Sequence, residues 1–513
     1  MPSHSFLSSC RACPSALCHN CPSPGLSRRD LLAGGLALTA LTAAPRAFAS
    51  DPERQQPIRL PLKVQPVLVY AIPQRREATG WREWGGILTE QDAEQERQRI
   101  GRELAALKSA ADFPLDVRPL ETAQSLERAA ALAKGDFDVV LSYAAGGSGR
   151  IYEALSVPGK WHVMFLRHRS GPVYLWYEIA HPRFLRKTVD EFGQPGVDVQ
   201  DVVVDSQNEI LIRLRALHGL KNTLGKKIVA VGGASGWGEG GRRAPDRARE
   251  LWRLEIADVP YPDLGERIKR ARANSGLVAR SEAEAGKYLG QKGVKLETSR
   301  QFVNNAFLLT EVFHRLLDEA GTDAITINHC MGTIMPMAET TACLPLSLLN
   351  DAGYMAFCES DFVVIPSGIL LHYISGKPVF LNDPTHPHDG VVTIAHCTAP
   401  RKMDGVHAEP ARILTHFESD YGAAPKVEMK KGQRMTNLIP DFASKRWLGF
   451  EGEVIDNPFM NICRSQVDIT IRGDTNRLLS QMRGFHWMTS YGSYLRETGY
   501  ALRKAGVEWA SLG

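Results

Sequence analysis

The fold is decided by the stretch Phe137-Asp138-Val139-Val140-Leu141-Ser142, which runs on into Ala145-Gly146-Gly147-Ser148-Gly149. A short apolar run of this kind is typical of a strand that is buried in a parallel sheet. Another apolar run at residues 66–71 and a polar, helical stretch at 90–110 precede it. A strand, a helix and a second strand with a glycine-rich turn indicate a parallel α/β layer.

A second unit of the same kind begins with the apolar run at residues 227–233 and continues to a strand at 324–328. From about residue 350 the chain is richer in strands, proline and glycine. A length of 513 residues favours about three domains. We therefore predict a mixed α/β fold in three domains, two parallel α/β domains and a β-rich C-terminal domain, at residues 58–205, 206–349 and 350–513.

The first 49 residues are expected to be a twin-arginine signal peptide. Arg28 and Arg29 are followed by an apolar stretch at 31–44 and by the small-residue cleavage site Ala47-Phe48-Ala49. The apolar stretch is short for a membrane span. We therefore expect export to the periplasm and no stable membrane span after cleavage, with a retained anchor as the alternative.

Four cysteines lie ahead of the twin arginines in a doubled Cys-x-x-Cys pattern: Cys10, Cys13, Cys18 and Cys21. This spacing suits a zinc ion or a cluster. Cleavage of the signal would remove it, so we favour an unusual signal region or a misassigned start over a working metal site. The other five cysteines mostly lie in apolar contexts, where a thiol packs as a small hydrophobe. Pairing of Cys358 with Cys397 stays open at this stage.

The charge and the motifs narrow the function classes. A formal net charge of +4 with interspersed acids does not resemble a nucleic-acid footprint. No Gly-x-Ser-x-Gly elbow and no phosphate-binding lysine motif occurs, so hydrolases and kinases lack support.

Ionisable residues follow two short apolar runs in the C-terminal part of the chain. Glu359 and Asp361 come after Cys358, His396 comes after Ala395, and His486 lies near the C-terminus. Residues two apart in a strand share a face, so the two carboxylates are expected to enter one cleft. Carboxylates with imidazole suit Mn²⁺ or Mg²⁺, and also zinc. The alternative is that these are ordinary acids at strand ends.

The segments at 347–361 and 375–383, together with His396 and Cys397, resemble the L-fucose isomerase and L-arabinose isomerase superfamily, and most of all its shorter, fucose-isomerase-like bacterial members. The likeness is specific from about Asn328 to Pro400 and around His486. It implies that the two α/β domains are Rossmann-like, that the C-terminal domain is barrel-like and carries much of a metal site, and that the protein is a homo-oligomer.

The resemblance also implies a site. In the family a glutamate, an aspartate and a late histidine hold a divalent ion, usually Mn²⁺, and the two carboxylates move the proton. Carried over, Glu339, Asp361 and His486 are the ligands, and Glu339 and Asp361 are the catalytic residues. Glu359 and His396 are alternates, and Glu359 replaces Glu339 if the spacing of L-arabinose isomerase applies. Mg²⁺ and Co²⁺ are the other candidate ions.

The expected reaction is aldose–ketose interconversion of a monosaccharide through a cis-enediol. Three further residues are expected to contact the sugar: Trp237, His329 and Trp487. Trp237 would stack on the sugar ring and His329 would bind a hydroxyl group. His386 and His388 lie in a proline-rich turn that suits a substrate loop or plain surface better than a metal site.

Two other functions stay open. Export and the uncertain first glutamate suit a non-catalytic sugar-binding relative of the isomerases. Residues 236–241 also match the Gly-x-Gly-x-x-Gly spacing of a dinucleotide loop. Trp237 would crowd the approach of a pyrophosphate, so we rank an NAD-dependent oxidoreductase last and predict no bound nucleotide cofactor.

Overall fold

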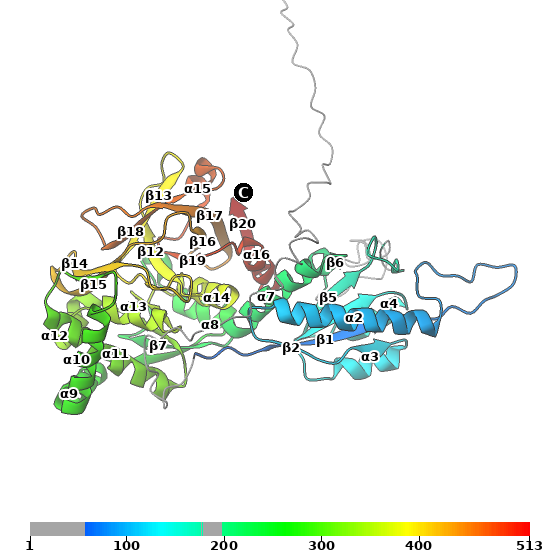
Figure 1. Cartoon of the computed structure of the whole chain (residues 1–513), viewed down its shortest axis with the longest axis horizontal. Coiled ribbons are helices and arrows are strands. Elements are labelled where there is room, and N and C mark those ends of the chain that lie inside the picture. The colour runs from blue at the N-terminus through cyan, green and yellow to red at the C-terminus, as the bar shows by residue number, and fades with distance from the viewer. Residues whose placement is uncertain (1–56, 176, 178–196, 513) are drawn as a thin grey trace, which may run out of the picture. The chain divides into compact units, whose positions relative to one another are not determined.

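The first sheet is parallel and six-stranded, and it carries the motif from which the fold was predicted. The computed structural model describes residues 57–175, 177 and 197–512. In this sheet β4 (Val139–Ala144), buried along its whole length, lies between β1 (Leu62–Val69) and β5 (Trp161–Leu166), and all registers are parallel. The other strands are β2 (Leu115–Val117), β3 (Glu121–Ala123) and β6 (Val202–Val204), and the helices are α2 (Glu90–Ala110), α3 (Leu126–Ala133) and α4 (Gly149–Leu155) (Figure 1).

A second parallel sheet follows in the chain. Its four strands run in the order β11-β10-β7-β8, and all three registers are parallel. The strands are β7 (Lys227–Val231), β8 (Glu255–Val259), β10 (Ala324–Ile327) and β11 (Met355–Phe357). The helices of this part are α7 (Gln207–Thr223), α8 (Ala244–Trp252), α9 (Tyr261–Ala273), α10 (Ser275–Leu289), α11 (Arg300–Ala320), α12 (Met335–Ala338), α13 (Cys343–Asp351) and α14 (Ile365–Ser375).

The C-terminal part contains a closed ring of six antiparallel strands, since β16 pairs with both β17 and β19 in the order β16-β19-β12-β13-β18-β17. These strands are β12 (Phe380–Pro384), β13 (Val391–His396), β16 (Arg434–Pro440), β17 (Arg446–Asp456), β18 (Ser465–Thr470) and β19 (Trp487–Tyr491). β20 (Glu508–Leu512) adds to β17 in parallel, after α15 (Thr475–Gln481) and α16 (Leu495–Lys504). A three-stranded sheet joins β9 (Val294–Leu296), β14 (Ala411–His416) and β15 (Tyr421–Val427). The predicted mixed α/β fold, with two parallel sheets and a barrel in the C-terminal region, is confirmed.

A glycine in α14 brings the second sheet and the barrel together. A Cβ atom at Gly368 would lie 2.8 Å from the ring of Phe357 in β11 and 2.8 Å from the methyl carbon of Met488 in β19. Only the absence of a side chain allows this approach. Phe357 is two residues before Glu359, and Met488 is two residues after His486. The close contact therefore holds two distant segments of the predicted site against the same helix.

The predicted signal peptide, with its four cysteines, lies outside the described residues. Within the part of the chain that the structure describes, no helix combines the length and the apolar character that a membrane span requires.

Candidate metal centre

Three barrel strands bring an aspartate and two histidines to one place. In β12, Asp383 pairs with Ala395 of β13, and Asn382 pairs with Trp487 of β19. His396 and His486 are the next residues after Ala395 and before Trp487, so both flank Asp383. The donor atoms of Asp383, His396 and His486 all lie within 4.8 Å of one another.

Glu359 joins this group from the second sheet. Its Oε2 lies 3.3 Å from Nε2 of His486, and its Oε1 lies 3.4 Å from Nε2 of His396. Nε2 of His486 is also 3.1 Å from Oδ1 of Asp383. Both imidazoles are buried, whereas the Glu359 side chain is 43% exposed. The centre therefore consists of two buried imidazoles and two carboxylates, with Glu359 on its open side.

Asp361 contacts His486 at Nδ1, behind the ring as seen from the centre, which Nε2 faces. Its Oδ2 lies 2.7 Å from Nδ1 of His486, and its Oδ1 accepts the backbone N–H groups of Trp237 at 3.1 Å and Val363 at 3.0 Å. An Nδ1–H that donates to a carboxylate fixes the tautomer that presents Nε2 as a ligand atom. Asp361 and His486 were predicted as ligands of one ion, and the two do lie together. The structure places Asp361 behind the ring, where it orients His486, and no candidate ligand group among the described residues includes Asp361.

A left-handed turn aims Glu359. β11 ends at Phe357, so the strand alternation that was expected to put Glu359 and Asp361 on one face does not extend to them. Instead Glu359 and Ser360 have φ values of 66° and 47°. Left-handed backbone costs of order 1–3 kcal/mol per non-glycine residue and is found where the surrounding structure imposes it. Here Ser235 donates its N–H to the carbonyl of Ser360 and accepts that of Phe362. The turn brings both carboxylates to His486 from different sides.

The charges of the centre favour a cation. Burial would lower the pKa of His486, but Asp361, Asp383 and Glu359 raise it to about 12. Burial likewise opposes protonation of His396, whereas Glu359 and Asp383 raise its pKa to about 9. Burial raises the pKa of Glu359, and the two imidazoles nevertheless hold it well below its ordinary value. The carboxylates thus favour positive charge at the position of the two imidazoles.

Two atoms of the centre indicate directly that it could accommodate a ligand. Nε2 of His396 and Oδ1 of Asp383 are buried and make no regular hydrogen bond in the structure. Buried polar atoms of this kind call for a partner, and a bound ion is one explanation. Glu359, Asp383, His396 and His486 could therefore hold a metal ion.

Glu339, the other candidate for the first carboxylate, has a different environment. Its side chain is 58% exposed and forms an ion pair with Arg272 at 2.7 Å. None of the candidate metal-ligand groups found among the described residues includes it. Glu359, the predicted alternate for the first glutamate, is the one that lies beside the two histidines.

The three predicted sugar contacts differ in exposure. Trp237 is 44% exposed and stacks on Phe485 with a ring separation of 4.1 Å and an interplanar angle of 14°. Its ring centroid lies 6.4 Å from that of His486, so this aromatic pair borders the centre. His329 is exposed after β10. Trp487 is fully buried against Phe450, so its ring is closed to a ligand here.

The glycine-rich loop packs on itself. A Cβ atom at Gly236 would lie 2.1 Å from the carbonyl oxygen of Gly241, so the two glycines are required for close contact within the loop. A short 3₁₀ turn, Glu239–Gly241, separates the loop from α8, which begins at Ala244. The amide of Trp237 is bound to Asp361. This geometry supports a role at the metal centre and gives no support to a dinucleotide site.

Sequence reasoning missed Asp383 as a ligand. It follows an apolar strand start and precedes Pro384, the same pattern of an ionisable residue after an apolar run that pointed to Glu359 and His396. In the sequence, Asp383 belongs to the segment 375–383 that resembles the isomerases, and no pattern marks it as a ligand apart from this one.

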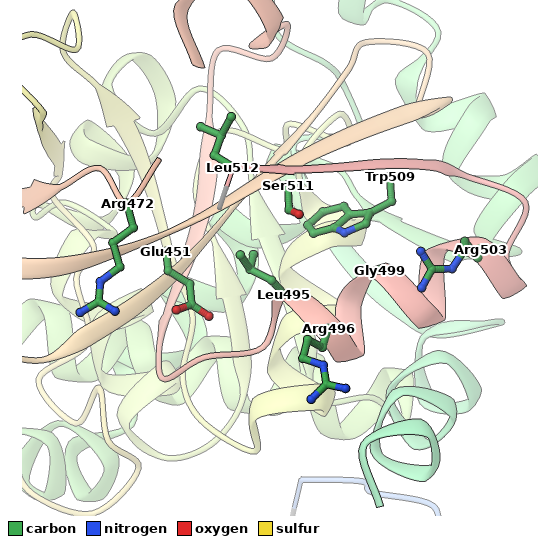
Figure 2. Close-up of a pocket in the computed structure, with 9 residues that line it drawn as sticks. All are labelled: Glu451, Arg472, Leu495, Arg496, Gly499, Arg503, Trp509, Ser511 and Leu512. Carbon is green, nitrogen blue, oxygen red and sulfur yellow. The ribbon is translucent and has the colours of Figure 1, made fainter. Parts of the chain in front are cut away.

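A pocket of about 440 Å³ is lined by residues other than these ligands (Figure 2). It contains none of the candidate metal ligands, and it is lined by Glu451, Arg472, Leu495, Arg496, Gly499, Arg503, Trp509, Ser511 and Leu512. Arg496 is already paired with Glu209 and Arg472 with Glu453. The pocket does not change the assignment of the centre.

Comparison with known proteins gives no relative: no family model matches the chain, and no curated protein sequence matches it. The resemblance to the L-fucose isomerase superfamily stays a prediction that rests on the residues themselves.

Asp361→Asn is expected to lower the affinity of the centre for Mn²⁺ by about 10- to 100-fold, the usual cost of losing a partner that orients a ligand. The amide keeps the shape and can still accept the N–H of Trp237, but it no longer supplies the charge that favours the Nδ1–H tautomer. Calorimetric titration of metal-free protein would measure the change.

Asp404→Asn is the matched control. Oδ2 of Asp404 lies 2.8 Å from Nδ1 of His407, the same pair of atoms, on a histidine whose side chain is 84% exposed. This variant should bind Mn²⁺ as the unmodified protein does. Unchanged affinity in Asp361→Asn would show that Asp361 does not orient the ligand.

Proposed function

We propose that the chain is a metal-dependent sugar isomerase that interconverts an aldose and a ketose through a cis-enediol. The observation that carries the proposal is the convergence of Glu359, Asp383, His396 and His486 beside an exposed aromatic pair. The resemblance to the L-fucose isomerase superfamily supplies the reaction. The doubly wound strand orders of the two parallel sheets are compatible with Rossmann-like domains.

The donor set suits a divalent ion of intermediate softness. Two imidazole nitrogens with carboxylate oxygens are typical ligands of Mn²⁺, Fe²⁺, Co²⁺ or Zn²⁺, whereas Mg²⁺ prefers oxygen and water. We assign Asp383, His396 and His486 as the ligands, because their donor atoms are mutually close. We take Mn²⁺ as the resident ion, with Co²⁺ or Mg²⁺ as alternatives.

The bound ion would act as a Lewis acid toward the oxygens on C1 and C2 of the open-chain sugar, which makes the proton on C2 more acidic. Glu359 takes this proton and returns it to C1, because it is the carboxylate on the open side of the centre. A second proton moves from the C2 hydroxyl to the C1 oxygen, so that atoms balance in an aldose-to-ketose conversion.

The aromatic pair gives the sugar a binding face. Trp237 and Phe485 are 44% and 38% exposed, and both rings border His486. Sugar C–H groups pack well on aromatic faces when a few polar groups fix their orientation. Trp237 therefore keeps its proposed role in sugar binding, beside the residues that would hold the ion.

The proposal extends to the location of the protein in the cell and to its assembly. We propose export to the periplasm by the twin-arginine route, which carries folded proteins, so that the ion is loaded before export. We also propose a homo-oligomer, as in the family.

The second candidate is an exported, non-catalytic sugar-binding protein. The exposed aromatic pair supports it, because stacking alone suffices for sugar binding. The two candidates differ in the need for the ion, since a binding protein requires the pocket and can dispense with the metal.

The deciding experiment combines elemental analysis with a screen of aldoses on the full chain purified as exported. We expect about one manganese or related divalent ion at the centre per chain, and ketose formation that chelation abolishes and Mn²⁺ restores. Absence of a divalent ion at this centre, with failed reconstitution, would shift the assignment to the sugar-binding protein. Bound metal with no turnover of any aldose would exclude the isomerase reaction.

A further inference from the structure

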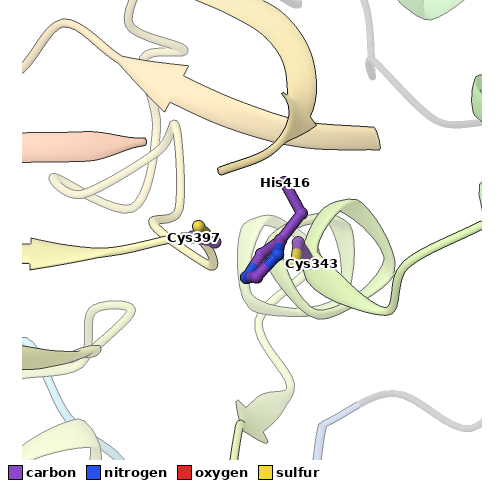
Figure 3. Close-up of side chains that lie close together, drawn as sticks. All are labelled: Cys343, Cys397 and His416. Carbon is purple, nitrogen blue, oxygen red and sulfur yellow. The ribbon is translucent and has the colours of Figure 1, made fainter. Parts of the chain in front are cut away.

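A second group of metal-ligand side chains lies in the interior. Cys343, Cys397 and His416 have their donor atoms within 4.8 Å of one another. All three are buried, at 5%, 2% and 7% exposure. Figure 3 shows the imidazole of His416 directed toward the space between the two cysteines. The isomerase proposal uses none of the three.

The three side chains come from separate elements. Cys343 is the first residue of α13, Cys397 follows the last residue of β13, and His416 is the last residue of β14, next to a register irregularity. A single ion would therefore tie the second α/β part to the barrel and to the three-stranded sheet. Ties of this kind are the usual role of closed metal sites.

The hydrogen bonds around the group suit metal ligation. Nδ1 of His416 lies 3.2 Å from the hydroxyl of Ser419, which leaves Nε2 as the ring atom free to bind an ion. The backbone N–H of Arg464 donates to Sγ of Cys397 at 3.3 Å. The same N–H group could also donate to a metal-bound sulfur.

A third sulfur lies against the same group. Cys463 packs on the cluster formed by Cys343, Cys397 and Ala424. Ligand atoms of a tetrahedral zinc site with Zn–S bonds of about 2.3 Å are separated by roughly 4 Å. The separations within 4.8 Å among Cys343, Cys397 and His416 are close to this value, and Cys463 would complete the set by rotation of its side chain.

We propose that Cys343, Cys397 and His416, with Cys463 as the fourth ligand, form a structural zinc site. Sulfur and imidazole ligands in a buried, four-coordinate arrangement favour zinc over the Mn²⁺ that we assign to the first centre. A disulfide would use two of the sulfurs and leave His416 without a role in the group.

The site is coupled to the first centre through β13. His396 is the last residue of β13, and Cys397 follows it directly. One strand end thus supplies a ligand to each site. Zinc binding would fix this strand end and, with it, the position of His396.

The test is elemental analysis of the full chain with single variants. Unmodified protein should hold about one zinc per chain, and titration of its thiols with a mercurial should release that zinc. Cys343→Ser and Cys397→Ser should lose the zinc, whereas Cys330→Ser should retain it. Cys330 is the control because it is a free cysteine outside this group.

A second measurement covers variants that fail to fold. Cobalt-substituted unmodified protein should show an intense sulfur-to-cobalt charge-transfer band, which oxygen ligands do not produce. Zinc retained in Cys397→Ser, or no zinc and no such band in the unmodified protein, would overturn the site. A disulfide found by thiol counting and intact mass under denaturation would overturn it as well.

The two sites are separable in the same assay. His486→Ala should lose the ion of the first centre and keep the zinc, so failure of the isomerase proposal leaves the zinc result interpretable. A chain with zinc and no sugar turnover would support this inference alone.

Discussion

His486→Ala is expected to abolish metal binding at the first centre and sugar turnover with it. The imidazole is the only group there that contacts three carboxylates, namely Glu359, Asp361 and Asp383, among the residues that the structure describes. Its removal deletes a ligand and leaves these charges without their shared partner. The loss of affinity should therefore exceed the roughly 100-fold that an outer partner such as Asp361 contributes.

The measurement is manganese content after dialysis, together with ketose formation at saturating Mn²⁺. Circular dichroism and thermal unfolding establish that the variant folds. His407→Ala is the control, because that histidine is exposed and pairs only with Asp404 in the described contacts. Full occupancy by manganese in His486→Ala would remove His486 from the ligand set and with it the assignment of the centre.

The same residues show how far the sequence reaches. The apolar runs that end at Cys358 and Ala395 predicted ionisable groups at strand ends, and Glu359 and His396 do lie together. Local pattern sufficed for them because Glu359 lies two residues after the end of β11 and His396 is the last residue of β13. The parallel α/β layers were predictable for the same reason, since each strand and helix has a recognisable pattern within its own short stretch of sequence.

The roles within the site could not be read in this way. Whether Asp361 meets the ion or stands behind His486 depends on a left-handed turn at Glu359 and Ser360. Such a turn in non-glycine residues is imposed by tertiary contacts and has no sequence signal. The contact of Asp383 with His486 likewise depends on the register of β12 against β19. That register is set only when the strands assemble into the barrel.

Glu359→Gln against Glu339→Gln separates the two candidates for the first carboxylate. Glu359 lies between the Nε2 atoms of His396 and His486 and is open to solvent, whereas Glu339 is held by Arg272. Glutamine at 359 keeps the size of the side chain and loses the ability to accept a proton. We expect turnover to fall by about 10²- to 10⁴-fold, the usual contribution of a general base.

Metal content and isotope exchange locate the defect. Because Asp383, His396 and His486 remain, Glu359→Gln should still bind Mn²⁺, and the fall should appear in kcat more than in KM. Incorporation of solvent deuterium into the product should fall together with turnover, since the carbon-bound proton then has no acceptor. Glu339→Gln should behave as the unmodified protein in all three measurements, because its loss breaks only a half-exposed ion pair. The reverse pattern would return the catalytic role to Glu339 and require the chain around α12 to move toward the centre, a rearrangement that the pairing with Arg272 opposes.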